Sequence, residues 1–126
     1  MKILILIARI LLGLVFLLFG LIGVFHLAPK PPMPEGLMKQ FVDVFETSHY
    51  SFIVSLIQVV SAVPFLINRY VPLALVVIGP VIVNILLFHI LMAPASIGPG
   101  VFVAICWFIV FYGHRPAFSG IFAAKA

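Results

Sequence analysis

Long apolar runs dominate this chain and restrict it to a few kinds of fold. From Ile3 to Phe25 the only charged residue is Arg9. About 20 mainly apolar residues in an α-helix are enough to cross the hydrocarbon core of a bilayer. Of the 126 residues, 65% are hydrophobic and 8% are charged, whereas soluble domains average roughly 25% charged residues. The sequence therefore predicts an integral membrane protein, because a soluble fold would lack a water-compatible surface.

The predicted fold class is all-α, a transmembrane four-helix bundle formed by a single domain over residues 1–126. The predicted spanning helices cover residues 3–25, 50–67, 71–92 and 100–113. The first apolar run is too long for an ordinary signal peptide and no A-x-A-like cleavage site follows it, so we expect a retained helix. Asn68-Arg69 separates the second and third helices by so little that these two should be antiparallel neighbours.

The connection from His26 to His49 is the only long one. It opens with several prolines, which favour extended backbone, at Pro29, Pro31, Pro32 and Pro34. Residues 35–47 then read as a short amphipathic helix, with Met38, Phe41, Val42 and Phe45 on one face. This helix is too short and too charged to span, so we expect it to lie at the membrane interface.

The distribution of basic residues predicts the orientation. One side of the membrane would hold Lys2, Arg9, Arg69, Arg115 and Lys125, and the other only Lys30 and Lys39. Because cytoplasmic loops are enriched in Lys and Arg, we expect both termini in the cytoplasm and the long connection outside. The expected location is a bacterial cytoplasmic membrane.

Polar residues inside the apolar runs are the candidates for function, because such groups usually face the interior of a bundle. Arg9 shares a helical stripe with Gly13, Phe16 and Gly20, which predicts a packing face for the first helix. Arg9 itself either extends to the cytoplasmic phosphates or binds an anionic or carbonyl group inside the bundle. Gln58 and Asn84 are expected to form interhelical hydrogen bonds more often than ligand contacts.

Histidines and other reactive residues give weaker signals. His26, His49 and His89 fall near the outer surface, but their spacing matches no metal or haem motif. Cys106 is the only cysteine, which excludes an intramolecular disulfide and a CxxC redox pair. No nucleophile elbow, Walker loop or dinucleotide fingerprint is present, so no catalytic residue is predicted. The net charge of +4 comes from scattered basic residues, so we expect no nucleic-acid partner.

If a small molecule binds, the predicted site lies between the first three spanning helices, in their outer half. Its ligand-binding residues would be Arg9, Gln58, Asn84, His89 and His26, with Phe41 and Phe45 as a lid. Neutral amides can both donate and accept hydrogen bonds. They suit a lipophilic molecule with carbonyl groups, such as a quinone, better than an ion. They are poor proton carriers, so binding is expected rather than turnover unless a histidine supplies the proton, and whether the protein is an enzyme stays open.

Two segments carry a resemblance to a known family. The run Arg9-Ile10-Leu11-Leu12-Gly13-Leu14-Val15-Phe16 with Phe19-Gly20 resembles the first helix of DoxX-like membrane proteins. The run from Pro80 to His89 resembles their third helix more closely. The resemblance covers roughly residues 7–112. Relatives often have Glu where this chain has Gln58. The resemblance implies an association with quinone-linked membrane oxidoreductases, and therefore quinone as a cofactor and redox subunits as partners.

Three functions follow from these observations and stay open at this point. The first is a quinone- or lipophile-binding accessory subunit of a membrane oxidoreductase complex. The second is a structural or assembly protein of the membrane with no chemistry of its own. The third is a carrier for a small lipophilic molecule. Membrane lipid is an expected partner in each case, and the apolar surface of four short helices favours a homo-oligomer.

Overall fold

The fold is all-α, as the sequence predicts. The computed structural model describes residues 1–27, 32–121 and 123–124, so the predicted roles of Pro29, Lys30, Pro31 and Lys125 lie outside the described residues. Five α-helices form within the described part: α1 Lys2–Phe25, α2 Leu37–Thr47, α3 Tyr50–Ile67, α4 Val71–Met92 and α5 Gly98–Gly113. Two 3₁₀ turns, η1 Pro94–Ser96 and η2 Arg115–Phe118, flank α5.

The helix boundaries follow local sequence signals. α3 and α4 begin and end at the predicted residues. Asn68 and Tyr70, in the turn between them, adopt the left-handed backbone conformation, which ends α3 at Asn68. α5 begins at Gly98, two residues before the predicted start, with Pro99 in the first turn, where its missing N–H costs nothing. α2 begins at Leu37, after Gly36 with a φ of 149°. α1, α3 and α4 are long and apolar enough to cross a membrane, and α5 is a shorter apolar helix.

Helices α1 and α3 form a close pair through the predicted glycine stripe. A Cβ on Gly20 would lie 2.7 Å from a Val59 methyl carbon and 2.9 Å from the Ser55 carbonyl oxygen. A Cβ on Gly13 would similarly collide with Leu66. The absence of side chains at these positions lets the two backbones approach, as in other membrane helix pairs. The predicted packing face of α1 is therefore confirmed.

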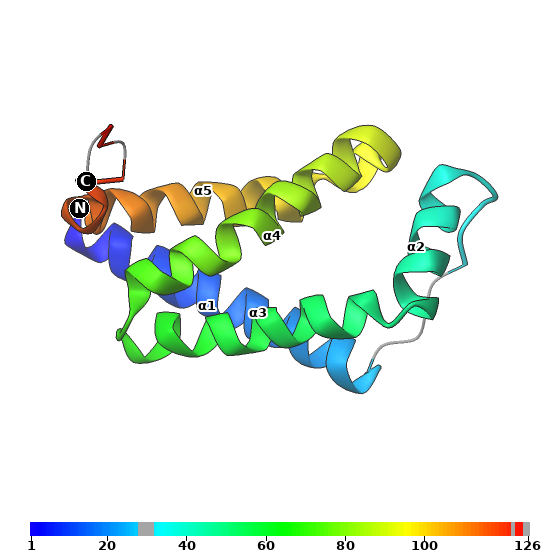
Figure 1. Ribbon diagram of the computed structural model, residues 1–126, viewed down its shortest axis with the longest axis horizontal. Coiled ribbons are helices and arrows are strands. Elements are labelled where there is room, and N and C mark those ends of the chain that lie inside the picture. The colour runs from blue at the N-terminus through cyan, green and yellow to red at the C-terminus, as the bar shows by residue number, and fades with distance from the viewer. Residues whose placement is uncertain (28–31, 122, 125–126) are drawn as a thin grey trace.

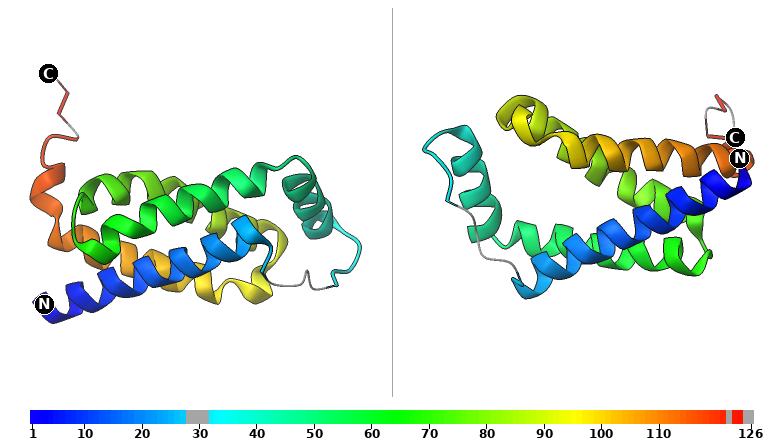
Figure 2. Two further views of the ribbon diagram at one scale, coloured as in Figure 1. Left: turned by 90° about the horizontal axis from the view of Figure 1, so that it is seen from below. Right: turned by 180° about the vertical axis from the view of Figure 1, so that it is seen from behind.

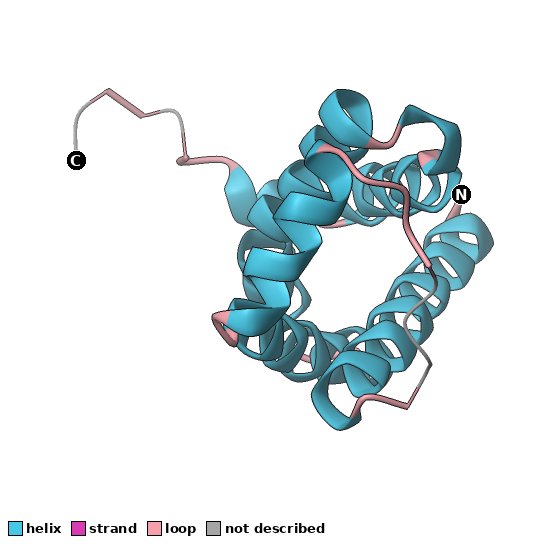
Figure 3. Cartoon of the chain, turned by 90° about the vertical axis from the view of Figure 1, so that its right-hand side faces the viewer, coloured by secondary structure: helices cyan, strands magenta, loops and turns pink. Residues whose placement is uncertain are grey.

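Helices α4 and α5 form the second pair. The Trp107 indole N–H donates a hydrogen bond to the Leu75 carbonyl oxygen at 3.0 Å. Near the opposite end of α5, Gly100 faces Ile85 of α4. The two pairs meet through contacts of α1 with α5 and of α3 with α4. The contacts between neighbouring helices thus form a ring in the order α1, α3, α4, α5. Figure 3 shows the helices arranged as a ring.

The two helix pairs meet closely at one end and separate at the other, so the molecule is forked (Figures 1 and 2). We call the joined end, which contains the Asn68–Tyr70 turn and the start of α1, the closed end. Most of the core lies toward it, and the fully buried side chains include Leu12, Phe65, Val71, Leu75, Ile78 and Val110. At the other end, the open end, α2 crosses from α3 toward α4 (Figure 1). No residue of α2 is itself buried.

Candidate functional site

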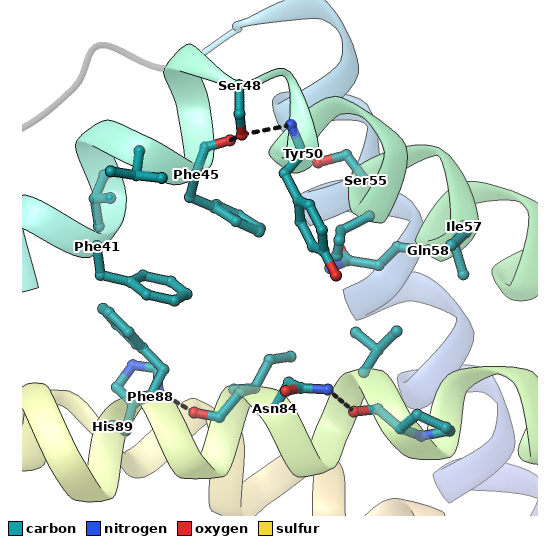
Figure 4. A pocket seen from close by; sticks show the side chains of 16 residues that line it. Phe41, Phe45, Ser48, Tyr50, Ser55, Ile57, Gln58, Asn84, Phe88 and His89 are labelled. Atoms are coloured by element: carbon teal, nitrogen blue, oxygen red, sulfur yellow. Dashed lines mark hydrogen bonds between the residues drawn. The ribbon is translucent and has the colours of Figure 1, made fainter.

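A cavity of about 610 Å³ lies in the fork between α2, α3 and α4. Its size falls within the range of roughly 300–1,000 Å³ that is usual for small-molecule sites. The cavity is in the open half of the molecule, and α2 covers its outer side (Figure 4). The lining residues are Phe41, Val42, Val44, Phe45, Ser48, Tyr50, Val54, Ser55, Ile57, Gln58, Pro80, Val81, Asn84, Ile85, Phe88 and His89.

The α3 wall presents the amide of Gln58 to the cavity. Gln58 is half-buried, and within the described part of the chain its side chain makes no hydrogen bond. The expectation of an interhelical hydrogen bond from Gln58 is therefore wrong. Tyr50, at the start of α3, adds an aromatic ring with a hydroxyl group (Figure 4). Both side chains can donate and accept hydrogen bonds, so this wall can bind a ligand group that donates a hydrogen bond or one that accepts it.

The α4 wall carries Asn84 and His89. The Asn84 amide nitrogen donates to the Pro80 carbonyl oxygen at 2.8 Å, within the same helix. Asn84 therefore does not join two helices either, and its Oδ1 and one N–H stay available. His89 Nδ1 lies 2.8 Å from the Ile85 carbonyl oxygen. Although Asn84 and His89 are about 140° apart on an ideal helix, both line the cavity because its α4 wall is wide.

Four aromatic rings connect the three walls, and we call Phe88, Phe41, Phe45 and Tyr50 the aromatic arc (Figure 4). The centroids of Phe88 and Phe41 are 5.1 Å apart, those of Phe41 and Phe45 are 5.5 Å apart, and those of Phe45 and Tyr50 are 5.5 Å apart. These distances are typical of favourable aromatic pairs. Of the predicted apolar face of the amphipathic helix, Phe41, Val42 and Phe45 line the cavity and Met38 does not. Lys39 pairs with Glu35 and Asp43.

Two predicted site residues lie away from this cavity. Arg9 is buried and donates a hydrogen bond to the Phe65 carbonyl oxygen at the end of α3. Arg9 therefore binds a carbonyl group inside the bundle, but this carbonyl group belongs to the protein and not to a ligand. The hydrogen bond links α1 to α3. His26 is exposed and ends α1 in the left-handed conformation. Neither residue lines the cavity, and no lining residue comes from α1, so the site lies between α2, α3 and α4 instead.

The sequence did not single out several aromatic and small residues of the site. Tyr50 and Phe88 close the aromatic arc, and Ser48 fixes the turn between α2 and α3 by accepting a hydrogen bond from the Tyr50 N–H at 3.3 Å. Aromatic residues near helix ends are ordinary in membrane proteins, so their type alone gave no signal. Phe88 lies four residues beyond Asn84, on nearly the same face of α4. This spacing could have indicated that Phe88 lines the same cavity as Asn84.

The site suits hydrogen bonding and ring stacking. Its polar groups are neutral amides, hydroxyls and one imidazole, set in an apolar and aromatic wall. Among the described residues, no three His, Cys, Asp or Glu side chains come together in a way that could hold a metal ion. Comparison with known proteins gave no matching family model, no matching curated protein and no matching solved structure.

Proposed function

We propose that this protein is an integral membrane protein that binds a lipophilic ring compound in the cavity between α2, α3 and α4. A quinone-type molecule is the prototype of such a ligand. The observation that carries the proposal is the Gln58 amide, which faces an apolar and aromatic cavity without a hydrogen-bond partner in the described part of the chain. Gln58 is half-buried, and its amide can donate to and accept from a polar group of a bound molecule.

The shape of the molecule supports binding over the other two functions. A structural protein without a ligand would be expected to close its bundle, whereas this one keeps a cavity of about 610 Å³ in the fork. A carrier would need a path through the molecule. Phe65, Leu75 and Ile78 are fully buried toward the closed end. Their side chains block a path from the cavity to that end.

The proposal includes a membrane topology. α1, α3, α4 and the shorter α5 would form a transmembrane four-helix bundle, with α2 at one interface. The start of α1 and the end of α5 lie together, because a Cβ on Gly113 would be 2.8 Å from an Ile5 side-chain carbon. The excess of basic residues supports a cytoplasmic location for this end. Labelling of single introduced cysteines in intact cells tests the topology: position 40 should react with an impermeant reagent, and position 119 should not. Reaction at 119 and protection at 40 would reverse it.

The family and the partners belong to the proposal too. The likeness of the first and third spanning helices to DoxX-like proteins supports a place beside a quinone-linked oxidoreductase in a bacterial cytoplasmic membrane. In that place the protein would act as an accessory subunit that holds the ring compound, because its amides bind without transferring protons. The exposed apolar residues along α1 and α4 offer surface for lipid, for a redox subunit or for a second copy.

Ligand binding to the purified full-length protein in lipid nanodiscs tests the function. We expect saturable binding of a short-tailed quinone or its reduced form, above the level in empty nanodiscs, and a rise in the melting temperature of the protein with ligand concentration. Gln58→Leu should weaken binding by about fivefold, as expected for one lost hydrogen bond of roughly 1 kcal/mol.

Gln40→Leu is the matched control for that experiment. Gln40 is exposed on α2 and does not line the cavity, so the same change of residue type there should leave the affinity unaltered. Equal affinity in the wild type, Gln58→Leu and Gln40→Leu would remove the cavity as the binding site. Binding no greater than in empty nanodiscs would refute the proposed function.

A further inference from the structure

His89 has a fixed hydrogen-bonding role in the cavity, unlike the amides. Its Nδ1 is 2.8 Å from the Ile85 carbonyl oxygen, and a carbonyl oxygen can only accept. Nδ1 must therefore carry the proton, and in a neutral imidazole the other ring nitrogen, Nε2, is then an acceptor without a hydrogen. Nε2 is at the end of the ring away from the backbone, and within the described residues it makes no hydrogen bond.

The other polar groups of the cavity do not require a hydrogen-bond donor on the ligand, as His89 Nε2 does. Gln58 offers a carbonyl oxygen and an NH₂ group, and Asn84 keeps its Oδ1 and one N–H after donating to Pro80. The Tyr50 hydroxyl can also act in either direction. A ligand with only carbonyl oxygens could bond to these groups, but it would leave His89 Nε2 without a partner. Only a ligand with a hydrogen-bond donor satisfies the whole set.

The surroundings of His89 specify where that donor would be attached. The Phe88 ring meets the His89 ring edge-on, with centroids 5.1 Å apart, and Phe41 packs on Phe88 at the same distance. Figure 4 shows these residues together at the outer end of the α4 wall. A flat aromatic ring placed along the aromatic arc would therefore bring a hydroxyl group on its edge toward His89.

We propose that the cavity selects hydroxyaromatic lipophiles, with the phenolic hydroxyl donating to His89 Nε2. This inference rests on the proposed function, because it names the chemical class of the ligand in the same cavity. The hydroxyl-bearing form of a ring compound should then bind better than a form in which the same oxygen only accepts. Gln58 and Asn84 accept or donate to a second polar group on the ring.

A phenol and its methyl ether provide the direct test. The probes are 4-pentylphenol and 4-pentylanisole, which share the ring and tail and differ in whether the oxygen carries a hydrogen. Binding is measured on the full-length protein in nanodiscs and corrected for partition into empty nanodiscs. We expect the phenol to bind about fivefold more tightly, which corresponds to one hydrogen bond between neutral groups.

Variants of His89 connect this preference to the proposed acceptor. In His89→Asn, the shorter amide can still donate to the Ile85 carbonyl oxygen but has no group at the position of Nε2, so the phenol should lose its advantage. His89→Gln places an amide oxygen near that position and should restore part of it. His114→Asn is the control, because His114 Nδ1 makes the same kind of bond, to the Val110 carbonyl oxygen at 3.0 Å, away from the cavity.

The outcomes separate this inference from the function on which it rests. Equal binding of phenol and ether to the wild type overturns the inference and leaves the proposed function standing. A preference for phenol that persists in His89→Asn also overturns it, because another group then receives the hydrogen bond. If neither probe binds above empty nanodiscs, both proposals fail. If a His89 variant does not fold, the ratio of phenol to ether in the wild type still decides.

Discussion

Gln58 and Asn84 show how the surroundings of a polar residue decide its role. Both were expected to join helices, since interhelical hydrogen bonds are the usual use of amides in membrane bundles. In the structure, Asn84 bonds within its own helix and Gln58 has no partner in the described part of the chain. Their contribution to the stability of the bundle should therefore be small.

The stability of two variants checks this conclusion. Gln58→Leu and Asn84→Leu should change the free energy of unfolding in detergent by less than about 0.5 kcal/mol, because neither removes a contact between helices. Thermal unfolding of the purified variants measures the effect. Trp107→Phe is a useful reference, because it removes a real bond between α4 and α5 and should cost roughly 0.6 kcal/mol. A larger loss in the amide variants than in Trp107→Phe would show that the amides hold the bundle together.

At the level of residues, the sequence predicted part of the site. Gln58, Asn84 and His89 were recognisable because polar groups are rare in apolar helices, and Phe41 and Phe45 because they share the apolar face of a short amphipathic helix. Arg9 was predicted for the same reason as the amides, yet it bonds to the Phe65 carbonyl oxygen elsewhere. Residue type reveals a buried polar group, but only the packing of the helices shows which space it faces.

At the level of helices, close backbone approach holds α1 against α3. Gly20→Ala should destabilise the protein by about 1–3 kcal/mol, the usual cost of overpacking, because the added Cβ would meet backbone atoms of Ser55 and Val59 within 3.0 Å. Gly79→Ala is the matched control, since a Cβ there would be 3.8 Å from Trp107, an ordinary contact. Thermal unfolding of both variants checks the claim, and equal stability would contradict it.

The position of α2 depends on the aromatic arc, because none of its residues is buried. Phe41→Ala removes the contacts with Phe45 and Phe88 and should speed hydrogen exchange of the α2 amides by about tenfold, since each aromatic pair contributes roughly 0.5–1.5 kcal/mol. Leu37→Ala, at a residue of α2 that is 67% exposed, should have little effect. Exchange that is equally fast in both variants would mean that the arc does not hold the helix.

The helices themselves were predictable, and their arrangement was less so. Apolar length and breakers such as Asn68 and Pro99 set the boundaries of α3, α4 and α5 to within two residues. The fork depends on how closely the two helices of each pair, and the two pairs themselves, approach one another along their length. These distances are set by contacts between residues that are distant in the sequence. Gly13 and Gly20 indicated a packing face but not its partner, so α1 was wrongly included among the walls of the site.

The whole molecule is a fork with two unlike ends (Figure 1). The closed end is filled by buried apolar side chains, and the open end holds the cavity beneath α2. Most of the buried core and the cavity thus lie in different halves of the bundle. Arg9 accordingly supports the fold through the Phe65 carbonyl oxygen, while Gln58 and His89 line the cavity.

Photolabelling tests this account most directly. A 4-alkylphenol with a diazirine group is irradiated with the full-length protein in nanodiscs, and the modified residues are found by mass spectrometry. If the cavity binds the probe, labels should concentrate on residues 41–48, 54–58 and 80–89 and should be lost when excess unlabelled 4-pentylphenol is present. Labels spread along lipid-facing residues such as Leu73 and Val60, which are 61% and 63% exposed, and unaffected by the competitor, would contradict it.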